Sequence, residues 1–181
     1  AGGVQLMEEL WQKLQFSEQV VPTVQVYEVL LGGYAFVGDG QKVAAAVADM
    51  RARWIKMTAR SHCVIIKGFL KNSMVDEVLQ QLQDMHAQGF KVPPFAATQF
   101  LRIASEAGRA AELLSAVRAV VAVPPEAMAS LLEDCVKKGN SEFAKRIEAL
   151  HGRGGEPLPP GALESLLKLR ASAGDPSAED L

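Results

Sequence analysis

The residues that most often carry out chemistry in proteins are few in this chain, and they are scattered. The three histidines, His62, His86 and His151, lack the spacing of metal ligands, and no Cys-x-x-Cys pair is present. The sequence also lacks a glycine-rich phosphate loop and the His-x-Glu pattern, followed by cysteines, that a nucleotide deaminase needs. We therefore expect no catalytic residue, no metal site, no cofactor and no small-molecule substrate, and hence a binding protein rather than an enzyme.

The two cysteines, Cys63 and Cys135, are far apart in the sequence, and each falls within an expected helix. Two distant cysteines in a chain of this size are typical of free thiols in a reducing compartment rather than of a disulfide framework. We therefore expect both to be unpaired and at least partly buried.

The chain repeats itself with a period of 35 residues. The segment Tyr-Glu-Val-Leu-Leu-Gly-Gly-Tyr at 27–34 aligns with His-Cys-Val-Ile-Ile-Lys-Gly-Phe at 62–69, and Asp-Met at 49–50 aligns with Asp-Met at 84–85. Self-similarity at such a period is the sign of a solenoid, in which each unit buries its apolar face against its neighbours. Solenoids usually present a long surface to a partner.

Proline pairs mark the ends of successive units. They occur at 93–94, 124–125 and 159–160, and proline both favours the first turn of a helix and disfavours helix in the residue before it. A second break, rich in glycine or asparagine, recurs within each unit, so each reads as two helices joined by a tight turn. The expected divisions are 1–23 (the second helix of an earlier repeat), 24–58, 59–93, 94–124 (a short repeat), 125–159, and 160–181 (a partial repeat and an acidic tail).

The first helix of each unit carries apolar residues at positions i, i+3, i+4 and i+7, which is the period of an amphipathic helix. Gly33 and Gly68 lie in the middle of two such helices, where glycine costs about 1 kcal/mol relative to alanine, and they indicate a close approach of helices. The expected stripe consists of Tyr27, Leu30, Leu31 and Tyr34; His62, Ile65, Ile66 and Phe69; Ala97, Phe100, Leu101 and Ala104; Met128, Leu131, Leu132 and Cys135; and Leu163, Leu166 and Leu167.

Composition and charge narrow the class of partner. A hydrophobic content of 49% in 181 residues is enough for a substantial core, and no stretch is long and apolar enough to span a membrane. The net charge is −2, but residues 24–123 carry eleven Lys/Arg against eight Asp/Glu, while the remainder carries eight against thirteen. A mildly positive middle between acidic ends fits a weak attraction of an anion to the central units.

A unit of 35 residues with two helices and an aromatic-x-x-Leu/Ile-Leu/Ile-x-Gly-aromatic opening resembles the pentatricopeptide repeat. The resemblance covers most of residues 24–172 and is strongest in 27–57 and in the following unit. It implies an all-α, right-handed αα-superhelical solenoid of helix-turn-helix repeats. It also implies that the first helices line a groove for single-stranded RNA, roughly one base per unit, in a mitochondrion or chloroplast.

The resemblance also implies which residues meet the RNA. The base-selecting pairs would be Glu28 with Thr58, Cys63 with Pro93, Thr98 with Pro124, and Ala129 with Pro159. The residues that wedge between bases would be Gln25, Arg60, Phe95 and Glu126. The lysines that meet phosphate would be Lys71 and Lys137.

Two functions remain open at this point. The first is a non-catalytic RNA-binding protein that serves transcript processing, stability or translation. The second is a degenerate repeat array that binds proteins within a large organellar assembly, because proline offers no side-chain hydrogen bond to a base. Trp54, which stands where the next unit has Gly89, is a candidate contact residue for such a protein partner. The neighbouring Arg51, Arg53 and Lys56 are typical of the charges that favour a helix C-terminus.

Overall fold

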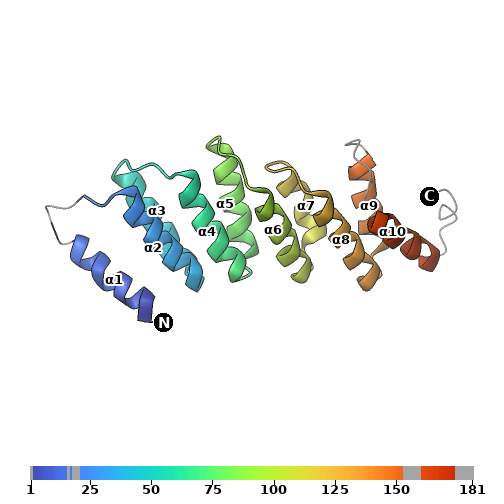
Figure 1. The fold of residues 1–181 in the computed structure, drawn as a ribbon, viewed down its shortest axis with the longest axis horizontal. Helices are drawn as coiled ribbons and strands as arrows, with labels where there is room; N and C mark the ends of the chain where they lie inside the picture. The colour runs from blue at the N-terminus through green and yellow to red at the C-terminus, as the bar shows by residue number, and fades with distance from the viewer. Residues whose placement is uncertain (1, 16, 18–20, 153–159, 174–181) are drawn as a thin grey trace. The chain divides into compact units, whose positions relative to one another are not determined.

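A computed structural model describes residues 2–15, 17, 21–152 and 160–173 of the chain. All regular secondary structure within these ranges is helical (Figure 1). The proline pair at 159–160 lies partly outside them, and the acidic tail at 174–181 lies entirely outside. The helices are α1 (Gly2–Gln15), α2 (Val24–Val37), α3 (Gly40–Ala52), α4 (Ala59–Lys71), α5 (Val75–Ala87), α6 (Pro94–Glu106), α7 (Ala110–Arg118), α8 (Pro125–Lys138), α9 (Ser141–Gly152) and α10 (Pro160–Ala173).

The first helices of the pairs begin where the sequence supplies a start signal. Thr58 accepts a hydrogen bond from the Ser61 N–H, and Ser61 Oγ in turn accepts from the Thr58 N–H, which gives α4 a complete capping box. Helices α6 and α8 instead begin with a proline at their first position, where no backbone N–H is required. These starts coincide with residues at which the expected repeats begin.

Helices α2 to α6 and α8 end in the same way, whereas α7 ends in the right-handed Ala119. The residue just past the helix takes a left-handed conformation, and the next N–H returns to a carbonyl in the last turn, which is the Schellman motif. After α4, for example, the N–H of Met74 donates to the Phe69 carbonyl at 3.0 Å. The left-handed residues in the described part of the chain are Gly38, Trp54, Ser73, Gly89, Gly108 and Gly139.

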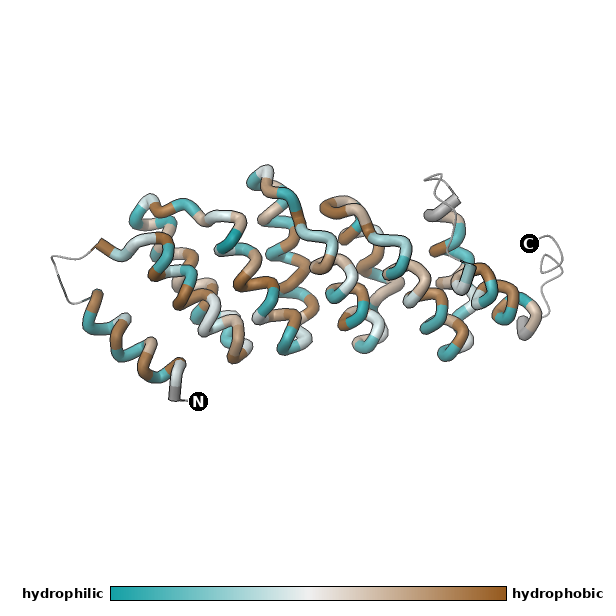
Figure 2. Tube along the Cα trace, in the orientation of Figure 1, coloured by the Kyte–Doolittle hydropathy of each residue, from teal (hydrophilic) through white to brown (hydrophobic). Residues whose placement is uncertain are grey.

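Two compact units make up the chain, and the first comprises residues 1–92. Within it, α2 and α4 lie side by side, α3 packs on α2, and α5 packs on α4 (Figure 1). Apolar and polar residues alternate around these helices, as Figure 2 shows by colour. The expected stripes of the first helices are buried here, and the second helices bury Val43, Met50, Val78, Leu82 and Met85.

The close approach expected at the helical glycines is confirmed. A Cβ built on Gly68 would lie 2.4 Å from the carbonyl carbon of Ala35, which belongs to the backbone of α2. A Cβ built on Gly33 would lie 2.6 Å from Sδ of Met7 in α1. Glycine at 68 therefore lets two first helices approach more closely than any other residue allows.

The second unit comprises residues 93–181. Here α6 packs against α7 and α8, and α10 packs against α8 and α9. The expected stripes of α6 and α8 are buried, but the stripe of α10 is partly wrong, because Leu163 and Leu167 are each 37% exposed. Leu166 is buried as expected, together with Ala162 and Leu169, so the inward face of α10 is rotated relative to the expected one. The spacing of the apolar residues could not show which side of α10 faces the core, because apolar residues lie on both sides of this helix.

Among the described residues, no helix has both the length and the apolar character that crossing a membrane requires.

Candidate nucleic-acid interface

The outer side of the α2–α4 pair brings together most of the expected RNA-contacting residues of the first unit. We define the α2–α4 face as Gln25, Glu28, Val29 and Phe36 on α2 with Arg60, Cys63, Lys67 and Lys71 on α4. Their spacing of three, four and seven residues places them along one side of each helix. Contacts between the two helices join the face near both ends, as described next.

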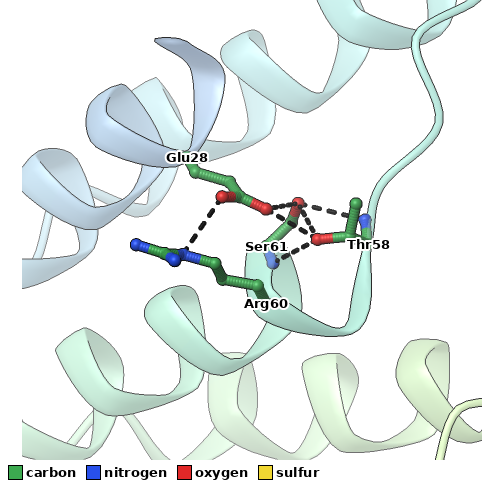
Figure 3. Close-up of polar contacts among 4 residues, drawn as sticks. All are labelled: Glu28, Thr58, Arg60 and Ser61. Atoms are coloured by element: carbon green, nitrogen blue, oxygen red, sulfur yellow. Dashed lines mark hydrogen bonds and ion pairs between the residues drawn. The ribbon is translucent and has the colours of Figure 1, made fainter. Parts of the chain in front are cut away.

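A polar network joins the two helices at their N-terminal ends (Figure 3). Thr58 Oγ1 donates to Glu28 Oε1 at 2.6 Å, and Ser61 Oγ donates to the same oxygen at 3.2 Å. The second carboxylate oxygen, Glu28 Oε2, lies 3.2 Å from Nε of Arg60. Thr58 also caps α4, so one hydroxyl both starts that helix and binds the preceding one.

The structure therefore brings the expected base-selecting pair, Glu28 and Thr58, into direct contact. The two side chains use their polar atoms on each other, however, and Glu28 is only 9% exposed. A base edge arriving here would have to displace an existing charge-assisted hydrogen bond. This pair is thus poorly placed to select a base, although it is well placed to tie two helices together.

An aromatic and a lysine meet near the C-terminal ends of the same helices. Nζ of Lys71 lies 3.2 Å from the centroid of the Phe36 ring, which is a close cation–π contact. Phe36 is 55% exposed, and it occupies in the first repeat the place that Lys71 occupies in the second. The pair presents an exposed positive charge above an apolar ring, which is a combination suited to a nucleotide.

The charge of the α2–α4 face is positive. Arg60, Lys67 and Lys71 lie along one side of α4, and Glu28 is the single acid of the face. Glu28 forms its ion pair with Arg60, at the end of the face remote from Lys71. A polyanion is therefore attracted mainly to the C-terminal half of α4.

The remaining residues of the first unit that were expected to contact RNA are less prominent. Gln25 is exposed in the first turn of α2. Cys63 is half-buried, and burial is the main reason that the pKa of its thiol is raised. At neutral pH Cys63 is a neutral thiol and contributes no charge to the face.

The corresponding side of α6 and α8 in the second unit is different. Phe95 is 40% exposed in the first turn of α6, while Thr98 is half-buried and its hydroxyl donates to the Pro94 carbonyl at 3.5 Å. Lys137 is exposed in the last turn of α8. The cations Arg102 and Lys137 are outnumbered here by Glu106, Glu126 and Glu133.

Arg102 is also occupied within its own helix. Its Nη1 lies 2.7 Å from Glu106 Oε1, and its Nε donates to Gln99 at 3.1 Å. A depression of about 180 Å³ lies beside it, lined in part by Thr98, Ser130 and Asp134. The second unit is therefore a weaker binding surface for an anion than the first unit is.

Two members of the interface were not recognised from the sequence. Ser61 was missed although Thr-x-x-Ser before an apolar run is a detectable variant of the capping box. Phe36 was also missed, because its contact with Lys71 depends on how two repeats pack. Among the described residues, no group of three or more histidines, cysteines or carboxylates is placed to hold a metal ion.

Comparison with solved structures gives the class of fold. The chain superimposes on the crystal structure of the pentatricopeptide repeat protein PPR10 from maize with a TM-score of 0.55 and 20% sequence identity. It also superimposes on PPR10 in complex with an 18-nt psaJ RNA element, with a TM-score of 0.53 and 16% identity. These matches cover 98% and 99% of this chain, respectively. The expected fold class, an all-α helical-repeat solenoid like that of pentatricopeptide repeat proteins, is confirmed.

The likeness is one of fold over a limited length. The chain spans about a quarter of these solved proteins, 26% of the first and 27% of the second. No protein-family model matches the sequence, and no curated protein sequence matches it. The function must therefore be argued from the residues of this chain.

Proposed function

We propose that this chain binds single-stranded RNA on the α2–α4 face, without catalysis, as part of a pentatricopeptide-type array. The shared fold supports this, since one of the solved proteins with that fold is crystallised with an RNA element. The observation that carries the proposal is the cation stripe of α4 ending in the Lys71–Phe36 pair. Helix pairs 24–58, 59–93, 94–124 and 125–159 are taken as its repeats, with parts of two more at 1–23 and 160–181.

Each group of the face has a distinct task in this proposal. Lys71 swings from the Phe36 ring to a phosphate, which uncovers the ring for a base. Arg60 and Lys67 add to the attraction of the RNA backbone, and Gln25 contacts a base at the start of α2. Stacking is worth about 1–3 kcal/mol per base, so one or two stacked bases give only modest affinity. Tight binding then depends on further repeats.

A second function, a scaffold that binds proteins in a larger organellar assembly, is favoured by a different observation. The side chains of Glu28 and Thr58 are hydrogen-bonded to each other, and the outer side of α6 and α8 carries more acidic than basic residues. A closed pair and an acidic surface offer little to an RNA base or phosphate, and they leave these surfaces to a protein partner. Placement in a mitochondrion or chloroplast follows for either function only by analogy with pentatricopeptide repeat proteins.

Fluorescence polarisation with a labelled pool of random single-stranded RNA tests the first function. We expect saturable binding at low salt that weakens as salt rises, because phosphate contacts release counterions. Lys71→Ala should reduce affinity several-fold and lower the salt slope by about 0.7, the value for one contact on a single strand. Lys145→Ala, in α9 and outside the α2–α4 face, is the matched control and should change neither the affinity nor the salt slope. Polarisation that stays flat at low salt would leave the scaffold function.

A further inference from the structure

Trp54 occupies a backbone position that suits glycine. It follows α3 as the left-handed residue of a Schellman motif, with φ of 59°, and the Ile55 N–H donates to the Met50 carbonyl at 2.8 Å. One repeat later Gly89 holds the same place after α5, with φ of 79°, and the Phe90 N–H returns to Met85 at 3.1 Å. A bulky side chain in this conformation is rare, because its Cβ crowds the following backbone.

The side chain of Trp54 contributes nothing visible to the fold. It is 91% exposed, and within the part of the chain that the structure describes its indole N–H meets no acceptor. An exposed tryptophan held in a strained position is unfavourable for stability and for solubility. A strained outlier of this kind points to a function rather than to folding.

The C-terminal ends of α3 and α5 lie at the same edge of the first unit (Figure 1). Trp54 lines a recess formed by the residues that follow these ends. Its volume is about 610 Å³, and its half-buried floor consists of Ile55, Met57 and Phe90. Trp54 forms one wall, and the exposed Arg51 and Lys56 stand at the rim. We call this recess the Trp54 pocket.

The charges at the rim are available to a partner. Among the residues that the structure describes, neither Arg51 nor Lys56 forms an ion pair, whereas the nearby Arg53 bonds Asp49 at 3.1 Å. Two cations beside an apolar recess complement carboxylates that flank an apolar side chain. Tryptophan and arginine are also the residue types that dominate binding energy in protein interfaces.

We propose that the Trp54 pocket docks an acidic peptide segment of a partner protein. One apolar side chain of the segment enters the recess against Trp54, and its flanking carboxylates pair with Arg51 and Lys56. A peptide is favoured over RNA because the floor is half-buried and partly aliphatic, and Trp54 is the one ring of the pocket that is fully exposed. None of these residues belongs to the α2–α4 face, so the site is independent of the proposed RNA interface.

Selection of peptides from a random 12-residue display library tests the proposal. The library is selected on the full chain and counter-selected on Trp54→Gly, a variant that should stay folded because Gly89 serves in the equivalent motif. We expect the enriched peptides to carry an apolar residue flanked by Asp or Glu. Titrated as synthetic peptides, they should shift the fluorescence of Trp54 in a Trp11→Phe background.

Two variants decide whether the pocket is the site. Trp54→Gly and the double variant Arg51→Glu/Lys56→Glu should each weaken peptide binding about tenfold or more, while Lys71→Ala should leave it unchanged. Enrichment of no peptide, of basic peptides, or of peptides that bind Trp54→Gly equally well would overturn the proposal. A loss of random single-stranded RNA binding in Trp54→Gly, without peptide binding, would assign the pocket to RNA and overturn it as well. Loss of RNA binding in Lys71→Ala tests the other face, so the two proposals fail separately.

Discussion

Gly68 of α4 lies against Ala35 of α2 with no room for a side chain, since a Cβ there would sit 2.4 Å from the Ala35 carbonyl carbon. Backbone cannot move aside as a side-chain tip can, so Gly68→Ala must push two first helices apart. We expect a loss of about 1–3 kcal/mol in the free energy of unfolding, despite the better helix propensity of alanine. Urea denaturation followed by circular dichroism measures this.

Gly33→Ala is the control for that substitution. The atom that its Cβ would meet is Sδ of Met7, at the flexible end of a side chain. We therefore expect little change in stability at Gly33. Equal losses at the two glycines would mean that helix approach is not what Gly68 provides.

The side-chain amide of Asn72 links one repeat to the next by hydrogen bonds. Nδ2 donates to the carbonyl oxygens of Ala35, Phe36 and Gly68 at 3.1, 3.0 and 2.8 Å. Asn72→Ala should lower the free energy of unfolding by about 1–2 kcal/mol. Asn72→Asp should cost more at neutral pH, because a carboxylate then faces carbonyl oxygens, and should recover part of the loss in acid. A thermal melt at pH 7 and pH 4 separates the two variants, and identical behaviour would contradict the role of the N–H groups.

Cys135 makes stability depend on pH in the alkaline range. The thiol is buried, and burial raises its pKa from 9.0 to about 11. As pH rises, the unfolded chain therefore loses this proton before the folded chain does. The stability that the protonated thiol contributes is fully present below pH 9 and is lost as pH rises towards 11. At pH 10.5 the loss should be about 2 kcal/mol relative to pH 8.

Cys135→Ala isolates this effect from other groups whose pKa is also raised by burial, such as the Tyr27 hydroxyl. We expect the variant to lose less stability than the original chain between pH 8 and pH 10.5, measured by urea unfolding. Parallel pH profiles for the two proteins would show that the thiol is not responsible.

Glu28 should oppose the proposed binding of RNA at the α2–α4 face, because it places a carboxylate beside Arg60. Glu28→Gln keeps an oxygen that accepts from Thr58 and Ser61 but releases Arg60. We expect binding of random single-stranded RNA to tighten about threefold to tenfold at low salt. Fluorescence polarisation measures the gain, which should disappear in Glu28→Gln/Arg60→Ala. Unchanged affinity would place the RNA elsewhere.

Trp54→Gly should be as stable as the original chain or up to about 1 kcal/mol more stable. The substitution relieves a left-handed conformation, and the greater freedom of glycine in the unfolded chain offsets part of that gain. Differential scanning calorimetry measures the change. A clear loss of stability would show that the exposed indole supports the fold and would remove the reason to assign it a binding role.

The helices could be predicted because their signals are local. The Pro-Pro pairs and the spacing of Tyr27, Leu30, Leu31 and Tyr34 act within a few residues, and helix start and stop signals depend on the few residues at each helix end. Residues with two plausible apolar sides were harder to place. Leu163, Leu166 and Leu167 were expected in the core, but α10 buries Leu166 with Ala162 and Leu169 and leaves Leu163 and Leu167 partly exposed.

The amino-acid sequence by itself determined an all-helical repeat array, its period, and the glycines at which helices approach. The helices arise from interactions between residues close together in the chain, and the period and the recurring glycines become visible when one segment is compared with the next. Only the tertiary structure decided that Glu28 accepts a hydrogen bond from Thr58 and that the Lys71 ammonium lies over the Phe36 ring. It also decided that Trp54 and Phe90 line one recess. Each of these pairs is separated by 30 residues or more. Their meeting depends on how successive helix pairs stack, which no local pattern encodes.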